Sequence, residues 1–205
     1  MFGPFSVSTF GGKGQVLPQS RLRRQAAPHA SDVARQIGNI NRIKAVEIRT
    51  SHEGWFSAGK DRQKWAPETS ETADHSLLYI VALAMFDGDI TLSSYTPQKL
   101  RDSAIRAFMQ KIQVVDAPEM TRLYPKYAAT VVTATQDDGS TVARRVDNVP
   151  GFANHPMQRT DFEKKFRANT VSARGPRQAD EALAAVRSLD QSTSISTIFD
   201  RLVVT

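Results

Sequence analysis

The most apolar stretch of the chain is Ile80–Phe86, which contains no charged residue. A run of this kind is typical of a buried element, and the residues before it extend the pattern to the length of a helix. We therefore predict one long buried helix over Thr72–Phe86. Asp87 and Gly88 follow it, and a glycine in this place commonly ends a helix.

Shorter apolar and alternating segments predict strands. Ala45–Thr50 alternates between apolar and polar residues, as a half-buried strand does, and Ile112–Val115 is a short apolar run. Tyr127–Thr135 and Thr141–Val146 flank the turn sequence Asp137-Asp138-Gly139. This arrangement predicts an antiparallel hairpin.

Apolar residues recur at helical spacing in several other places. The predicted helices are one from about Ala30 to Gly38, one that starts at Thr96-Pro97 and breaks near Asp102-Ser103, one opened by the capping box Thr160-x-x-Glu163, and two amphipathic segments over 179–189 and 195–202. The segment 52–67 is predicted to be a polar loop anchored by Trp55, Phe56 and Trp65. Strands and helices mixed in this way indicate an α+β fold.

Composition fits one modest globular domain of 205 residues, 40% hydrophobic and 23% charged. Cysteine is absent, which excludes disulfides and zinc–thiolate sites. No apolar run approaches the roughly 18 residues that a membrane span needs, and no signal-peptide pattern opens the chain, so we expect a cytoplasmic protein without membrane contact.

Charge is distributed unevenly along the chain. The first 49 residues carry eight basic and two acidic groups, which accounts for the whole net charge of +6. We interpret residues 1–29 as a basic N-terminal arm, ahead of a domain over 30–150 and a C-terminal helical segment over 151–205. No aromatic residue follows Phe10 in the arm, so we do not expect it to bind nucleic acid.

Candidate chemistry lies where the predicted buried helix begins. Glu71, Asp74, His75 and Tyr79 can all carry or donate protons, and they stand directly before or within the apolar run. Titratable groups that enter a core acquire shifted pKa values and often perform acid–base chemistry. Spacing alone leaves a second interpretation open, namely a helix N-terminus with ordinary capping groups.

The motifs around this cluster resemble the MmgE/PrpD family, which includes 2-methylcitrate dehydratases. The resemblance covers roughly residues 44–205 and lies in the order of the motifs. They are Lys64-Trp65-x-Pro67-x-Thr69-x-Glu71-Thr72-Ala73-Asp74-His75-Ser76-Leu77-x-Tyr79, Asp87-Gly88-Asp89-Ile90-Thr91, Tyr95-Thr96-Pro97, Met109-Gln110-Lys111-Ile112, Asp116-Ala117-Pro118-Glu119, Asp138-Gly139, Asn154-His155-Pro156-Met157 and Glu163-Lys164-Lys165-Phe166.

The resemblance concerns the C-terminal portion of the family. It implies a small α/β lid-type domain followed by helices that pack on a large all-helical domain, and that domain has no counterpart in this chain. We therefore expect the apolar faces of the terminal helices to be exposed or buried against a second copy. The implied partners are another copy, as in a homodimer, or a separately encoded helical domain.

The resemblance further implies a lyase of propionate metabolism that eliminates water from a tricarboxylate 2-hydroxy acid such as 2-methylcitrate, without a metal or other cofactor. Tyr79 matches the family tyrosine that reaches the substrate, and Asp74 and His75 match its neighbours. Lys64 and His29 are candidates for substrate binding. The family's Lys-then-Tyr-Pro-then-His motif is otherwise broken between residues 16 and 29, so we expect the isolated chain to be inactive. The alternatives are a tricarboxylate decarboxylase or isomerase and a non-catalytic lid-like interaction module.

Overall fold

The computed structural model describes residues 21–148, 151, 154–192, 194–196 and 199. Its contacts separate two compact units, one ending at His155 and the other beginning at Pro156. Residue 29, the predicted end of the N-terminal arm, lies inside helix α1 (Arg21–Ile37).

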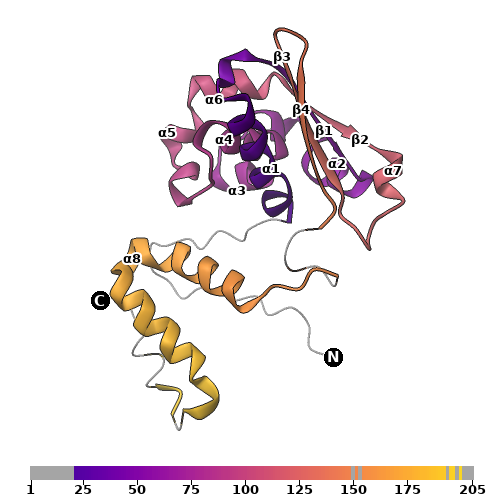
Figure 1. The fold of residues 1–205 in the computed structure, drawn as a ribbon. Coiled ribbons are helices and arrows are strands. Elements are labelled where there is room, and N and C mark those ends of the chain that lie inside the picture. The colour runs from indigo at the N-terminus through magenta and orange to yellow at the C-terminus, as the bar shows by residue number, and fades with distance from the viewer. Residues whose placement is uncertain (1–20, 149–150, 152–153, 193, 197–198, 200–205) are drawn as a thin grey trace. The chain divides into compact units, whose positions relative to one another are not determined.

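The first unit is built on a four-stranded mixed sheet with the strand order β2-β1-β3-β4 (Figure 1). Its strands are β1 (Ile43–Thr50), β2 (Ile112–Asp116), β3 (Thr130–Gln136) and β4 (Thr141–Val146). β1 pairs with β2 in parallel and with β3 antiparallel, and β3 and β4 form the predicted antiparallel hairpin. The α+β prediction is therefore confirmed.

One face of this sheet is buried. Val46 of β1 lies opposite Ile112 of β2 and Ala134 of β3, and all three side chains are buried. On each of these three strands, the residues next to the buried one are half-buried or exposed, as expected when successive side chains point to opposite faces of the sheet.

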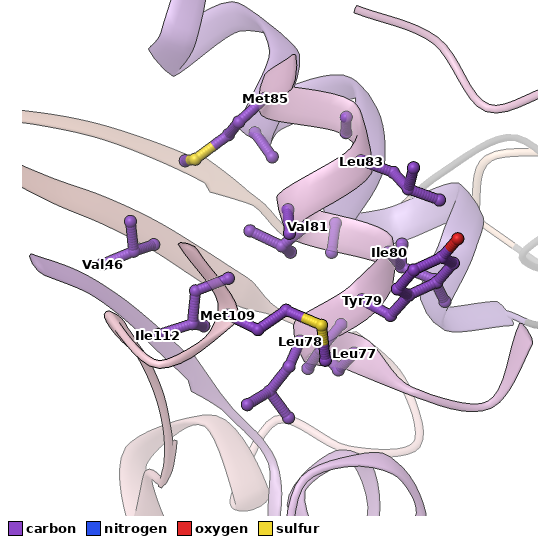
Figure 2. Packing of buried hydrophobic residues seen from close by; sticks show 14 of the residues in the cluster. Val46, Leu77, Leu78, Tyr79, Ile80, Val81, Leu83, Met85, Met109 and Ile112 are labelled. Carbon is purple, nitrogen blue, oxygen red and sulfur yellow. The ribbon is translucent and has the colours of Figure 1, made fainter. Parts of the chain in front are cut away.

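Helices cover the buried face. α1 packs against α4 (Leu77–Asp87), β3 and β4, and α4 packs against α6 (Ser103–Met109) and β2. Figure 1 shows α1, α4 and α6 on one side of the sheet. Every residue from Leu77 to Met85 is buried, and Figure 2 shows Val46, Met109 and Ile112 directed toward this helix. α4 is thus the centre of the core.

The predicted single helix over Thr72–Phe86 is wrong in its continuity. The chain forms α3 (Ser70–Asp74) and then α4, with His75 and Ser76 outside helical geometry between them. The Ser76 hydroxyl oxygen accepts a hydrogen bond from the backbone N–H of Tyr79 and so caps α4. The hydroxyl also donates to the backbone oxygen of Lys64. The predicted end is correct, because Gly88 adopts the left-handed conformation, with φ of 77°.

The loop predicted over 52–67 is also more ordered than expected. It contains α2 (His52–Ala58), capped by Ser51, and the 3-10 helix η2 (Arg62–Trp65). Trp55 is half-buried against the core, whereas Phe56 is 56% exposed and does not anchor the segment. A seven-residue helix without a long apolar pattern leaves little periodicity to detect.

The remaining short elements follow the sequence more closely. Thr96 caps α5 (Pro97–Leu100), and Asp102 caps α6 after the predicted break. The other elements are η1 (Ile40–Arg42), η3 (Leu92–Tyr95) and α7 (Pro118–Thr121).

The second unit contains α8 (Arg159–Arg187) and η4 (Leu189–Gln191). Gly175 breaks α8 with φ of 76°, and ion pairs join its two halves, Arg167 with Asp180 and Arg187 with Glu163. The two halves therefore fold back on each other as a helical hairpin.

The start of α8 differs from the prediction. The helix begins at Arg159, so its capping box is formed by Gln158 and Asp161 and not by Thr160 and Glu163. Glu163 pairs with Arg187 instead. The second predicted amphipathic segment includes Ile198 and Leu202, which lie outside the described residues.

Candidate active site

The segment from Asp74 to Tyr79 forms the turn between α3 and α4. Asp74 is the last residue of α3, and Tyr79 lies in the first turn of α4. Their side chains are almost inaccessible, with 2% of Asp74 and 0% of Tyr79 exposed. The sequence therefore places a carboxyl group and a phenol inside the core, where each requires hydrogen-bond partners.

Two consecutive residues of η3 supply partners to these groups. The Tyr79 hydroxyl donates to the backbone oxygen of Ser94 over 2.7 Å, and the Tyr95 hydroxyl donates to Asp74 Oδ1 over 3.1 Å. The centroids of the two tyrosine rings lie 6.2 Å apart. We call Asp74, Tyr79, Ser94 and Tyr95 the tyrosine cluster. It connects the α3–α4 turn to a segment about 15 residues further along the chain.

Burial controls the protonation of Tyr79. Loss of solvation raises the pKa of its phenol, and the carboxylates of Asp87 and Asp102 raise it further. The guanidinium of Arg106 acts in the opposite direction. The phenol is therefore neutral at physiological pH and serves as the hydrogen-bond donor to Ser94.

Arg106 is the cation associated with this cluster. It is half-buried on α6, and its Nε donates to the backbone oxygen of Leu100 over 2.9 Å. One terminal nitrogen donates to the backbone oxygen of Pro67 over 3.1 Å. A guanidinium has five N–H groups, so these two bonds leave donors for an anion.

His75 lies next to the tyrosine cluster in sequence but has a different environment. Its side chain is exposed, and its Nδ1 lies 3.0 Å from the backbone oxygen of Glu71. That contact orients the ring against the backbone of α3, which ends one residue earlier. The structure thus places Asp74 and Tyr79 in the core and His75 on the surface.

The two predicted substrate-binding residues lie elsewhere. Lys64 Nζ donates to the backbone oxygen of Ser57 over 2.8 Å, so its ammonium is directed toward α2. His29 is half-buried on α1, where burial lowers its pKa. Asp32 opposes that shift and Arg144 adds to it. Neither of these charged neighbours belongs to the α3–α4 turn.

Ser94, Tyr95 and Arg106 were not among the residues predicted for the site, although all three act on Asp74 or Tyr79. Tyr95 was part of a recognised motif, but its separation of 21 residues from Asp74 gave no indication that the two side chains meet. Among the described residues, no group of three His, Asp or Glu side chains is arranged to hold a metal ion.

A comparison with models of known protein families supports the resemblance seen in the sequence motifs. The MmgE/PrpD C-terminal domain matches residues 20–191. The match covers most of the chain, and the protein therefore belongs to the MmgE/PrpD family.

Three relatives have named activities. The 2-methylcitrate dehydratase of Cupriavidus necator is 31% identical over 159 residues, which is 73% of this chain and 31% of that protein. The cis-aconitate decarboxylase of Mus musculus is 27% identical over 103 residues, 50% of this chain and 21% of that protein. The cis-aconitate decarboxylase of Homo sapiens is 24% identical over 136 residues, 64% of this chain and 27% of that protein.

The matched region thus spans less than a third of each of these relatives. Within the described part of the chain, no helix combines the length and the apolarity that crossing a membrane requires.

Proposed function

We propose that this chain is the C-terminal part of a 2-methylcitrate dehydratase-like hydro-lyase that acts on a small tricarboxylate. The observation that supports the proposal most strongly is the tyrosine cluster, because it holds the hydroxyl of Tyr79, the tyrosine of the family motif, in one position as a hydrogen-bond donor. The C. necator relative, at 31% identity, favours dehydration.

The reaction removes a proton from a carbon beside a carboxylate while the neighbouring hydroxyl leaves as water. The hydroxyl needs a proton from an acid, and a neutral phenol can donate one. In the described conformation the Tyr79 proton is directed to the Ser94 oxygen. Tyr79 therefore serves the substrate only when that hydrogen bond is exchanged for one to the leaving hydroxyl.

Asp74 and His75 are assigned supporting roles in this proposal. Asp74 holds η3 through the Tyr95 hydroxyl, and His75 orients the last turn of α3. Cations must also hold the substrate carboxylates. Arg106 is a better candidate for this task than Lys64, because its charge acts on Tyr79 and its bonds to Leu100 and Pro67 use two of its five N–H groups. The ammonium of Lys64 contacts the Ser57 oxygen.

A second candidate is decarboxylation, which two relatives named cis-aconitate decarboxylase favour. In that reaction the bond between a carbon and a carboxylate breaks, carbon dioxide leaves, and the carbon receives a proton. The same neutral phenol would serve as the proton donor. The two reactions differ in the product that leaves, water or carbon dioxide.

The experiment combines this chain with the part of the C. necator dehydratase that lies outside the matched region. 2-Methylcitrate and cis-aconitate are supplied separately, and unsaturated acid and carbon dioxide are measured. We expect loss of water from 2-methylcitrate by the mixture and no turnover by the chain alone. Release of carbon dioxide from cis-aconitate, with no loss of water from 2-methylcitrate, would favour the decarboxylase. Full activity of the chain by itself would contradict the proposal that it needs a complementary part.

A further inference from the structure

A histidine–aspartate pair lies apart from the tyrosine cluster, at the carboxyl ends of the two parallel strands. His52 follows β1 closely, and Asp116 is the last residue of β2. Thr50 and Asp116 are paired across the two strands, so the ends of both strands meet at the same edge of the sheet. Open sheets with parallel strands commonly hold their ligands at this edge.

The imidazole of His52 is fixed in several ways. Its Nδ1 lies 2.6 Å from Asp116 Oδ2, and its backbone N–H donates to the hydroxyl oxygen of Thr121 over 2.8 Å. Its ring stacks on that of Phe56, with centroids 6.1 Å apart and planes 29° apart, and lies 5.5 Å from that of Trp55. The side chain is nevertheless 55% exposed.

This geometry determines which nitrogen is free to react. With the imidazole neutral, Nδ1–H donates to the Asp116 carboxylate, and Nε2 keeps its lone pair. No hydrogen bond to Nε2 occurs among the residues that the structure describes. A carboxylate that accepts from Nδ1–H holds the ring in this tautomer and in this orientation.

A cation and an aromatic surface lie beside the pair. Lys60 Nζ is 5.4 Å from the centroid of the Trp55 ring and 5.1 Å from that of Phe56. Phe56 is 56% exposed, so it offers an apolar surface close to both the ammonium and the imidazole. Arg49 and Glu119, on β1 and α7 beside the pair, are paired with each other, and Glu53 follows His52 in the first turn of α2.

We propose that His52 and Asp116 form a second, proton-transfer site that accepts small aromatic carboxylates, with His52 Nε2 as the base and Asp116 as its positioning residue. The substrate ring lies on Phe56, and its carboxylate pairs with Lys60. This site is independent of the function proposed for the tyrosine cluster.

Ester hydrolysis provides a probe of this base. In 4-acetoxybenzoate, water adds to the ester carbonyl carbon while Nε2 takes a proton from the water. The bond from that carbon to the phenolic oxygen then breaks, and the imidazolium returns the proton to the leaving oxygen. The products are acetate and 4-hydroxybenzoate, and no further reactant is needed.

The test measures hydrolysis of 4-acetoxybenzoate and of its neutral methyl ester by the full chain. We expect His52→Gln to lower the rate on 4-acetoxybenzoate roughly 10-fold, less than the 10²–10⁴-fold of an enclosed general base because the site is half open. Asp116→Asn should give a smaller loss. Lys60→Met should remove the preference for the carboxylate-bearing ester. His155→Gln is the matched control, because His155 is also exposed but its Nδ1 lies 3.2 Å from a backbone oxygen, that of Asn148.

A second measurement does not depend on any variant. Nitrogen-15 NMR of the unmodified chain at neutral pH should show the His52 proton on Nδ1. A proton on Nε2 would overturn the proposal, as would a folded His52→Gln protein that hydrolyses 4-acetoxybenzoate as fast as the unmodified chain. If the Lys60→Met variant still prefers 4-acetoxybenzoate to its neutral methyl ester, the assignment of aromatic carboxylates as the substrate class is overturned.

Discussion

Tyr79→Phe tests the hydrogen bond on which the tyrosine cluster depends. The substitution keeps the ring, which is fully buried, and removes only the hydroxyl that donates to Ser94 over 2.7 Å. From the sequence alone, we expect this substitution to lower the free energy of unfolding by no more than about 1 kcal/mol, the value of one ordinary hydrogen bond. The structure raises this expectation, because the acceptor is a backbone oxygen of a residue that is itself only 3% exposed. A buried acceptor left without its partner costs about 1–3 kcal/mol.

The assay is urea unfolding followed by circular dichroism, with Tyr124→Phe as the control. Tyr124 is 36% exposed, so removal of its hydroxyl should change the free energy of unfolding little. Equal stability of the two variants would refute the buried hydrogen bond of Tyr79.

Alkaline pH gives a second signature of the same residue. The pKa of Tyr79 is raised above its ordinary value of 10.0, so the folded state favours the protonated phenol. That contribution is fully present below pH 10 and is lost as pH rises from 10 toward the raised pKa. The difference in free energy of unfolding between the unmodified chain and Tyr79→Phe should therefore shrink as pH rises above 10. A difference that stays constant would contradict the raised pKa.

Three further variants, one of them with two substitutions, test other parts of the account. Tyr95→Phe should lower the free energy of unfolding by about 1.5–3 kcal/mol, because it removes a donor to the buried Asp74; urea unfolding that shows no loss would argue against that contact. Ser76→Ala should cost about 0.5–2 kcal/mol through loss of the cap on α4, and a neutral effect would indicate that α3 and α4 join as one helix. Phe162 and Val186 are 58% and 42% exposed on α8, so the chain should self-associate at concentrations on the order of tens of micromolar. Replacing both residues with serine should reduce the association measured by light scattering. If the unmodified chain is a monodisperse monomer, the prediction of self-association is wrong.

Periodicity predicted the elements whose residues meet the core in a regular order. Alternation identified β1, and the turn sequence at Gly139 identified the hairpin of β3 and β4. The break between α3 and α4 was missed, because Ser76 stops the helix through its side chain within a run that otherwise looks helical. Capping by a single hydroxyl leaves almost no trace in a hydrophobic pattern.

The motif of the candidate site could be predicted from the sequence, but the residues that surround it in the fold could not. Asp74, His75 and Tyr79 were identified together, but their sequence neighbourhood did not distinguish the buried side chains from the exposed one. His75 is exposed because it lies at the helix break, a position that the continuous-helix prediction could not reveal. Tyr95 and Arg106 reach the cluster through tertiary contacts, which no local spacing encodes.

Association through the C-terminal helices was predicted from the apolar faces of the segments 179–189 and 195–202, and the structure changes which apolar residues are exposed. Leu183 is 7% exposed and is buried within its own unit, whereas Val186 and Phe199 are exposed. Ile198 and Leu202 lie outside the described residues. The surface available for a second copy or a helical partner is thus better represented by Phe162, Val186 and Leu189.

The most direct test of the proposed function is turnover of 2-methylcitrate by this chain combined with the complementary part of the C. necator relative. Tyr79→Phe should lower turnover by roughly 10²-fold or more, as expected when a proton donor is removed. His75→Gln should lower it less and should also lower stability, because His75 has a supporting contact. A fully active Tyr79→Phe enzyme beside a folded but inactive His75→Gln enzyme would contradict the account.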